Sequence, residues 1–157
     1  GHTTAFLEVE DGKQQMQKLF VEAKLLASND FDLYWPTTNP NDKPRAPVEP
    51  FLQVLAERQV VPLEKSLKLL CEKGRYGYLP IEKYDVDVDF ARSFPRDACM
   101  RWCILPFDRM SKSTLVATAN PFNKQALREL ETHCKGRVLW YLTPPVELVR
   151  TLKKIFR

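Results

Sequence analysis

Apolar residues recur at helical spacing near the start of the chain. Between residues 14 and 28 they form a single stripe, with charged residues on the rest of the surface; the stripe consists of Met16, Leu19, Phe20, Ala23 and Leu26. This spacing predicts an amphipathic helix over residues 14–28. We expect the stripe to pack into a core, and docking of a partner protein is the alternative.

Prolines dominate the stretch that follows. Residues 30–50 contain five of the twelve prolines in the chain: Pro36, Pro40, Pro44, Pro47 and Pro50. Each proline fixes φ and removes a backbone donor, so we expect neither a helix nor a central strand to run through this stretch. It is predicted to be an extended linker and a domain boundary. Its aromatic residues Phe31, Tyr34 and Trp35 are expected to anchor it to a neighbouring surface, rather than to bind a peptide.

A pair of short helices is predicted next, over residues 51–59 and 62–74. Pro62 suits a first helical turn, and Gly74 is placed to end the second helix. A DNA-reading helix-turn-helix would begin its second helix with basic and polar residues. This helix begins with Leu63 and Glu64, and phosphate would repel the acid, so DNA binding is not expected.

The pattern changes after residue 75. Short apolar or β-branched runs predict strands over residues 76–81, 103–107, 114–120 and 137–142, while helical spacing predicts helices over 94–102, 123–136 and 144–156. Asn123 is a candidate N-cap for the second of these helices, and Gly136 a candidate stop. The chain is therefore predicted to be an α+β protein with N-terminal helices and a linker, then a small three- to four-stranded sheet covered by helices.

Composition is that of a soluble protein with a core. The 157 residues are 44% apolar, and no apolar run approaches the ~18–20 residues that would span a bilayer. There are 24 basic and 20 acidic residues, which gives a net charge of +4. Because the two signs are interspersed, this charge does not predict a nucleic-acid partner.

The five glycines exclude one large class of enzyme. They are too far apart to form either G-x-x-x-x-G-K-[ST] or G-x-G-x-x-G, so this chain has no P-loop for nucleotide hydrolysis. Gly1 and His2 resemble the remnant of a cleaved tag, and we therefore expect a piece of a longer protein.

Other candidate chemistry is weak. Cys71, Cys99, Cys103 and Cys134 form no C-x-x-C pair, so we expect reduced thiols buried in the core, and redox or metal chemistry is the alternative. His133 is expected to be a solvated surface residue.

Two further polar clusters have structural explanations. The acids Asp85, Asp87 and Asp89 lack the glycine and glutamate of an EF-hand, and we interpret them as a solvated segment or as caps of a short helix. Thr118, Asn120 and Asn123 cluster at the end of a predicted strand, where α/β sheets often bind ligands, but Asn120-Pro121 is better explained as a turn that caps the next helix. No enzyme, cofactor or metal is predicted.

The order of these elements resembles the N-terminal MshEN-like domain of type II secretion and type IV pilus assembly ATPases. The resemblance also rests on the run FPRDACMRWCILPFDRMSKSTLVATANPFNKQALRELETHCKGRVLWYLTPPVELVRTLKKIF. The matching positions are Pro95, Ala98, Leu105, Pro106, Leu115, Val116, Ala117, Asn120, Pro121, Ala126, Leu127, Val138 and the stretch 148–155. The resemblance covers about residues 50–157. The predicted organisation is a tag remnant at 1–2, a helix and proline-rich linker at 3–49, and the MshEN-like domain at 50–157.

The resemblance implies a non-catalytic docking and regulatory domain. In that family the domain precedes a P-loop ATPase domain of the same parent chain and couples it to the cytoplasmic part of an inner-membrane platform protein. It further implies a cytoplasmic protein, peripheral to the inner membrane through its partner, without direct membrane insertion or a nucleic-acid partner.

Two alternatives stay open: a cyclic di-GMP sensing domain, and the same fold in a stand-alone signalling protein. Family members that bind cyclic di-GMP use motifs that begin Arg-Leu-Gly. The corresponding stretch here is Pro50-Phe51-Leu52, and Gln59 stands where a second glycine is expected. Without the arginine and that glycine, the planar cation and the bare backbone are lost, so this ligand is not expected.

A docking domain predicts an exposed basic helix face. The best candidates are on the outer side of the last helix: Arg150, Lys153, Lys154 and Arg157. Lys18 and Lys24 of the first helix come next. The alternative for the last helix is a solvated face whose charge is favourable near a helix C-terminus.

Overall fold

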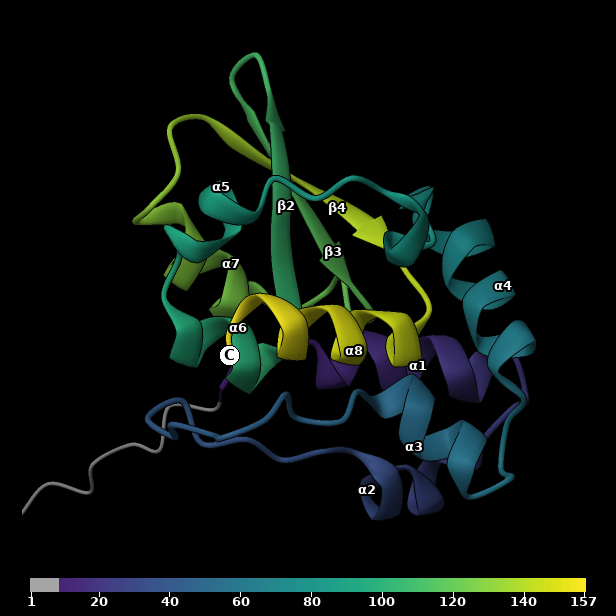
Figure 1. Ribbon diagram of the computed structural model, residues 1–157. Helices are drawn as coiled ribbons and strands as arrows, with labels where there is room; N and C mark the ends of the chain where they lie inside the picture. Colours follow the sequence, from purple (N-terminus) through teal and green to yellow (C-terminus); the bar gives the residue numbers. More distant parts are fainter. Residues whose placement is uncertain (1–8) are drawn as a thin grey trace, which may run out of the picture.

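A helical unit and a sheet unit form the molecule (Figure 1). The computed structural model describes residues 9–157, so the predicted tag remnant at Gly1 and His2 lies outside the described residues. The helical unit contains α1 (Lys13–Glu22), η1 (Ser28–Asp30), α2 (Phe31–Tyr34), α3 (Phe51–Glu57) and α4 (Leu63–Gly74). The sheet unit follows from residue 77. The predicted α+β class is confirmed.

Helix α1 is shorter than its apolar pattern predicted. Met16 and Phe20 of the stripe are fully buried, which confirms a core role for them, and Leu19 is half-buried. The prediction is wrong for Ala23, which is exposed beyond the end of the helix. The helix ends at Glu22 because Lys24 adopts a left-handed backbone with φ 59°. Leu26, the last member of the stripe, lies in the loop after the helix, and its side chain is buried.

One turn of helix lies at the start of the predicted linker, where we had expected none. Helix α2 spans Phe31–Tyr34 and ends before Pro36, with Trp35 in the extended conformation that a following proline favours. The prolines therefore exclude helix only from residue 36 onward. The rest of the stretch, residues 36–50, contains no helix or strand, as predicted.

Aromatic rings hold the helical unit together. The ring of Phe51, at the start of α3, has its centroid 5.3 Å from that of Phe20, 4.9 Å from Phe31 and 5.1 Å from Trp35. Phe31 and Trp35 stack at 5.5 Å. Such pairs contribute beyond their buried area. The predicted anchoring of the linker by its aromatic residues is confirmed.

The linker segment, residues 36–50, crosses α6 (Arg96–Trp102) of the sheet unit (Figure 1). The Nε atom of Arg101 donates to the Asp42 carbonyl at 2.9 Å, and Arg96 donates to the carbonyls of Pro44 and Arg45 at 3.2 and 3.0 Å. The Val48 amide donates to the Met100 carbonyl at 2.9 Å. These bonds fasten the linker segment to α6.

The sheet has four strands in the order β1-β4-β3-β2. They are β1 (Gly77–Tyr78), β2 (Ile104–Met110), β3 (Ser113–Thr118) and β4 (Arg137–Leu142). Strands β2 and β3 form an antiparallel hairpin with a bulge between Pro106 and Asp108, whereas β4 is parallel to both β3 and β1. Strand β2 runs past the predicted end at residue 107 and β3 begins before residue 114, so only Ser111 and Lys112 lie between them.

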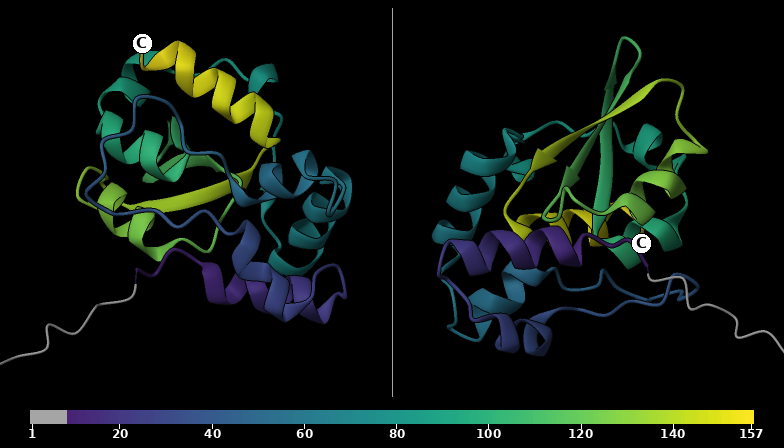
Figure 2. Two further views of the ribbon diagram at one scale, coloured as in Figure 1. Left: turned by 90° about the horizontal axis from the view of Figure 1, so that it is seen from below. Right: turned by 180° about the vertical axis from the view of Figure 1, so that it is seen from behind.

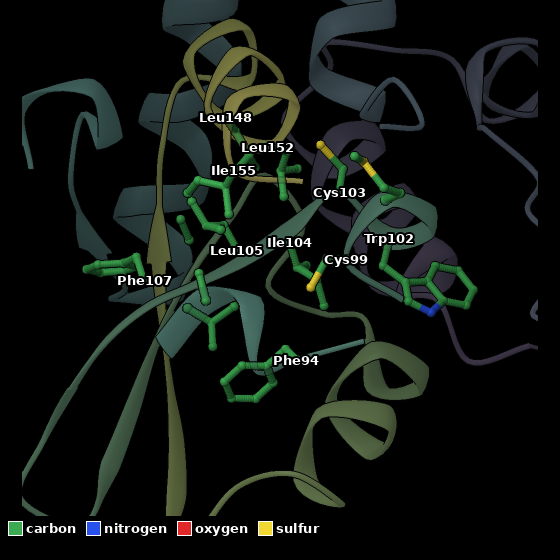
Figure 3. Close-up of a cluster of buried hydrophobic side chains, with 14 of the residues drawn as sticks. Phe94, Cys99, Trp102, Cys103, Ile104, Leu105, Phe107, Leu148, Leu152 and Ile155 are labelled. Carbon is green, nitrogen blue, oxygen red and sulfur yellow. The ribbon is translucent and has the colours of Figure 1, made fainter. Parts of the chain in front are cut away.

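Helices cover both faces of this sheet. Figure 2 shows α8 (Pro145–Ile155) and α7 (Lys124–Glu131) on opposite sides of it. Helix α5 (Val88–Arg92) packs beside β2, and the short η2 (Ile81–Lys83) packs against α8. In the core, Leu148, Leu152 and Ile155 of α8 meet the apolar side chains of β2 (Figure 3). The predicted helix over 123–136 ends at Glu131.

Candidate docking surface

Helix α8 separates an apolar face from a cationic one. Pro145 stands in its first turn, where a missing N–H costs nothing, and Leu148, Leu152 and Ile155 are buried. Arg150, Lys153, Lys154 and Arg157 are all exposed, so the four predicted residues lie at the surface of α8 and just beyond its C-terminus. Basic residues near a helix C-terminus also interact favourably with the helix dipole.

Arg150 is already paired. Its Nε atom donates to Oε2 of Glu82 at 2.9 Å, and Nη2 donates to Oε1 at 2.6 Å. This bidentate bond raises the pKa of the Arg150 guanidinium and lowers the pKa of the Glu82 carboxyl. Arg150 is thus a structural contact between η2 and α8, and less of its charge is available to a partner.

Two further bonds hold η2, one to Thr143 in the connection between β4 and α8 and one to Glu147 of α8. The Ile81 amide donates to the Thr143 hydroxyl at 3.0 Å in a buried position, and the Glu82 amide donates to Oε1 of Glu147 at 3.1 Å. Glu82 is therefore fixed by its backbone as well as by its side chain. In residues 9–157, no carboxylate lies within 4.0 Å of the ammonium of Lys153 or Lys154.

A shallow groove of about 380 Å³ runs between α8 and the η2–α5 segment. Lys154 lines one side; Glu82, Asp85, Val88 and Arg92 line the other. Arg92 also donates from Nε to the Ile155 carbonyl at 2.8 Å, which satisfies one free carbonyl at the end of α8. The α8 surface defined by Lys153, Lys154 and this groove is our candidate docking surface.

Lys18 and Lys24 lie elsewhere. Both are exposed, but they belong to α1 and the loop after it, on the far side of the molecule from α8 (Figure 2). The structure does not bring them together with the α8 residues.

The cysteine predictions hold for two of the four thiols. Cys99 and Cys103 are buried, and burial raises the pKa of the Cys99 thiol to about 12 and raises that of Cys103 as well. Cys71 and Cys134 are half-buried. All four are free thiols, so the buried pair behaves as part of the core.

Other predicted candidates are structural. His133 is exposed, as expected, and contacts the Thr132 hydroxyl. Asp87 accepts a hydrogen bond from the Phe90 amide at 3.0 Å, so it caps α5, as one of our two interpretations predicted. Within residues 9–157, no group of three His, Cys, Asp or Glu side chains is placed to bind a metal.

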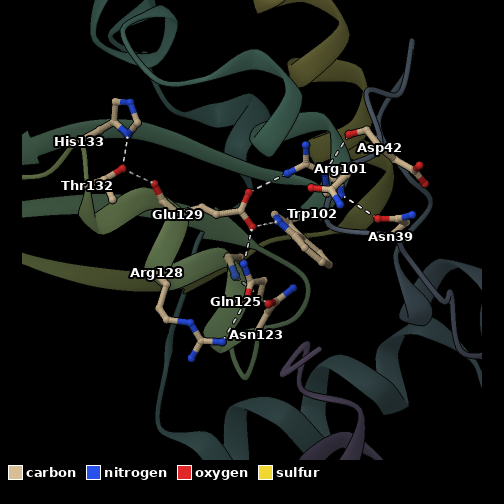
Figure 4. A network of polar contacts seen from close by, with 12 residues as sticks. Asn39, Asp42, Arg101, Trp102, Asn123, Gln125, Arg128, Glu129, Thr132 and His133 are labelled. Atoms are coloured by element: carbon tan, nitrogen blue, oxygen red, sulfur yellow. Dashed lines mark hydrogen bonds and ion pairs between the residues drawn. The ribbon is translucent and has the colours of Figure 1, made fainter. Parts of the chain in front are cut away.

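A buried polar network was not expected from the sequence (Figure 4). Arg101 is only 8% exposed and pairs with Oε1 of Glu129 at 2.7 Å; Oε2 of Glu129 accepts from the Trp102 indole, also at 2.7 Å. Since Arg101 also binds the linker segment, this network joins α6, α7 and the linker. It is a structural junction, with its donors and acceptors used internally.

The start of α3 does not suit a phosphate ligand. Pro50 is the N-cap of α3, and Phe51 and Leu52 are 2% and 0% exposed. No cation stands at these positions, and the Phe51 ring faces the aromatic core. Gln59 adopts φ 59°, the left-handed conformation that would favour the glycine expected there. These positions therefore lack the arginine and the glycine of the cyclic di-GMP motif described above.

Together these features define an α+β domain whose exposed chemistry is a charged surface. The MshEN domain family matches residues 75–157, more than half of the chain. The chain belongs to this family, the N-terminal domains of type II secretion and type IV pilus assembly ATPases that the sequence motif predicted.

Two solved structures share the fold. One, described as the structure of MshE with cdg, is 16% identical, has a TM-score of 0.60 and covers 89% of this chain and 97% of that chain. The other, the N-terminal domain of XpsE, is 10% identical, has a TM-score of 0.59 and covers 94% and 98% of the two chains. No curated protein sequence matches this chain. Among its described helices, none has the length and apolar character to cross a bilayer.

The sequence did not predict that Glu82 pairs with Arg150 on the α8 surface. Glu82 lies 68 residues from Arg150 and follows no motif. The opposite charges alone were visible in the sequence, and they do not specify which acid meets which base.

Proposed function

We propose that this chain is a non-catalytic docking and regulatory domain of a type II secretion or type IV pilus assembly ATPase, and that it couples the motor to the cytoplasmic part of an inner-membrane platform protein. The parent chain would then carry the ATPase domain. The domain would be cytoplasmic and peripheral to the membrane through its partner.

One observation carries this proposal: α8 of this chain presents exposed lysines that form no ion pair within the described residues. Lys153 and Lys154 have no carboxylate within 4.0 Å in the described chain, whereas Arg150 is held by Glu82. Long-range attraction to an acidic partner would steer association through these lysines. The groove beside Lys154 gives the partner an apolar contact at Val88.

The test is binding of the chain to the cytoplasmic domain of the platform protein encoded with its parent ATPase. Charge reversal in the variant Lys153→Glu/Lys154→Glu is expected to weaken binding about tenfold or more, mainly through a slower association rate. The matched control, Lys18→Glu/Lys24→Glu, changes the net charge equally on the far side of the molecule. Equal effects of the two variants, or no effect of either, would overturn the α8 surface as the docking site.

We also propose that cyclic di-GMP is not bound at the α3 motif. The buried Pro50 stands where the family motif has arginine, and the cdg that accompanies MshE in its solved structure belongs to that protein. Calorimetric titration of the chain with cyclic di-GMP is expected to give no heat and no thermal shift. A saturable titration that is weakened by Gln59→Glu, a change at the exposed position of the motif, would refute this.

A further inference from the structure

Four cations gather at the end of the sheet farthest from α8. Arg109 and Lys112 belong to the β2–β3 hairpin, and Lys135 and Arg137 to the turn and strand beside it. The backbone fixes this arrangement, because the Arg137 amide donates to the Lys112 carbonyl at 3.1 Å. Gly136 has φ 107°, and a Cβ there would collide with the same carbonyl. We call residues 109–112 and 135–137 the hairpin tip.

The charges of the hairpin tip are not neutralised within the domain. All four cations are exposed, and in the described part of the chain no carboxylate lies within 4.0 Å of any of them. The neighbouring acid, Asp108, accepts hydrogen bonds from the Tyr84 hydroxyl and from the Arg109 amide. These donors are neutral, so Asp108 counts as one acid beside the four cations, and the Arg109 guanidinium lies over the Phe90 ring, 5.1 Å from its centroid. The tip is still a net positive patch, on a protein whose overall charge is +4.

An apolar side chain stands at the apex of this patch. Met110 is 60% exposed, next to a turn in which Ser111 adopts φ 56°. Leu139, 37% exposed, lies on the same face of β4 as Arg137, since alternate residues of a strand share a face. An exposed flexible apolar residue flanked by cations is the arrangement that lets a protein sit at the boundary of an anionic bilayer.

The shape of the tip favours a lipid surface over a protein partner. The hairpin projects beyond the helices that surround the sheet, and α8 lies at the opposite end (Figures 1 and 2). A specific protein interface needs about 800 Å² from each partner, which a narrow convex tip supplies poorly. Fluid headgroups can close around such a tip without a complementary shape.

We propose that the hairpin tip binds the anionic headgroups of a phospholipid bilayer, with Met110 placed among them. Arg109, Lys112, Lys135 and Arg137 attract the headgroup phosphates, and the bilayer is contacted without being spanned. This contact is separate from the docking of α8, and neither depends on the other.

The test is flotation of the whole chain with vesicles of phosphatidylcholine alone, or of phosphatidylcholine with about one third phosphatidylglycerol. Binding is expected only to the anionic vesicles and is expected to fall as salt is raised, because the surface potential is screened. Each cation near such a surface strengthens binding about fivefold, so the variant Arg109→Gln/Lys112→Gln/Lys135→Gln/Arg137→Gln should lose about a hundredfold or more. Met110→Ser should weaken binding while leaving its salt dependence unchanged.

The matched control is Lys153→Gln/Lys154→Gln, which should bind anionic vesicles nearly as well as the unaltered chain. Circular dichroism establishes that each variant is folded. Equal binding to neutral and anionic vesicles, or loss of binding in the α8 variant but not in the tip variant, would overturn the proposal. It would also be overturned if the tip bound a polyglutamate peptide but not vesicles, since the patch would then serve an acidic polypeptide.

Discussion

The indole Nε1 of Trp35 donates a hydrogen bond to Oδ2 of Asp11, 2.9 Å away and 24 residues earlier in the chain. Trp35 is 7% exposed and stacks on Phe31 in the aromatic core. The Asp11 carbonyl in turn accepts from the Asn120 side chain at 2.7 Å. Asp11 therefore links the aromatic core of the helical unit to the end of β3.

The Trp35–Asp11 bond should contribute measurably to folding. In a double-mutant cycle of Trp35→Phe and Asp11→Ala, we expect a coupling energy of about 1 kcal/mol, since the cycle removes the contribution of the cavity left by the smaller ring. Urea denaturation of the four proteins measures it. Additive single effects would mean that the bond contributes nothing beyond packing.

Loss of Glu129 should be far more costly than loss of an exposed acid. The variant Glu129→Gln leaves Arg101, which is 8% exposed, without its counter-charge, and we expect destabilisation of about 2–3 kcal/mol. The control is Glu10→Gln, whose partner Arg128 is 51% exposed; there we expect less than about 0.5 kcal/mol. Chemical denaturation compares the two, and similar effects would contradict a buried role for the Arg101–Glu129 pair.

Glu49 should make stability depend on pH near neutrality. A hydrogen bond with Glu57, then burial, raises the pKa of the Glu49 carboxyl from 4.5 to about 7. The folded state thus holds a proton that the unfolded state releases, so this stabilisation is complete below about pH 4.5 and is lost as pH rises through about 7. Relative to the variant Glu49→Gln, the Tm of the unaltered chain is expected to fall between about pH 5 and pH 8. Parallel Tm profiles of the two proteins would count against the carboxyl pair.

Gln59 offers a stabilising substitution. It holds φ 59° at the join between α3 and α4, where a side chain is strained and glycine is not. We expect Gln59→Gly to stabilise the protein by about 0.5–1 kcal/mol, and Gln59→Val to destabilise it because a β-branched residue tolerates this conformation least. Thermal unfolding of both variants measures the difference, and a loss of stability with glycine would show that the Gln59 side chain makes a favourable contact.

Local signals predicted most of the fold and little of its long-range chemistry. The cap at Asn123 was visible in the sequence, and its side chain accepts from the Ala126 amide at 2.8 Å. The apolar spacing of α8 predicted its buried face correctly. These features depend on neighbours within a few residues, which periodicity and capping preferences describe well.

What the sequence did not predict depends on distant residues. Helix α1 ends early because Lys24 adopts a left-handed backbone conformation, and no glycine, asparagine or proline stands there to predict a helix end. In the sequence, Arg101 resembles any surface arginine of a helix. Its burial depends on Glu129, 28 residues away, and on the linker segment, and both contact it only in the folded chain. The hairpin tip combines residues from two segments, and only the β3–β4 pairing brings them together.

The linker segment is held by arginines that bind main-chain oxygens, at Asp42, Pro44 and Arg45. Every amino acid carries such an oxygen, so substitutions at residues 42–45 keep these hydrogen bonds. A change in the spacing between the carbonyls would not keep them. An exchange of side chains here should be silent, whereas a single inserted or deleted residue would put the carbonyls out of step with α6. The length of the linker segment, more than its composition, determines how it fits α6.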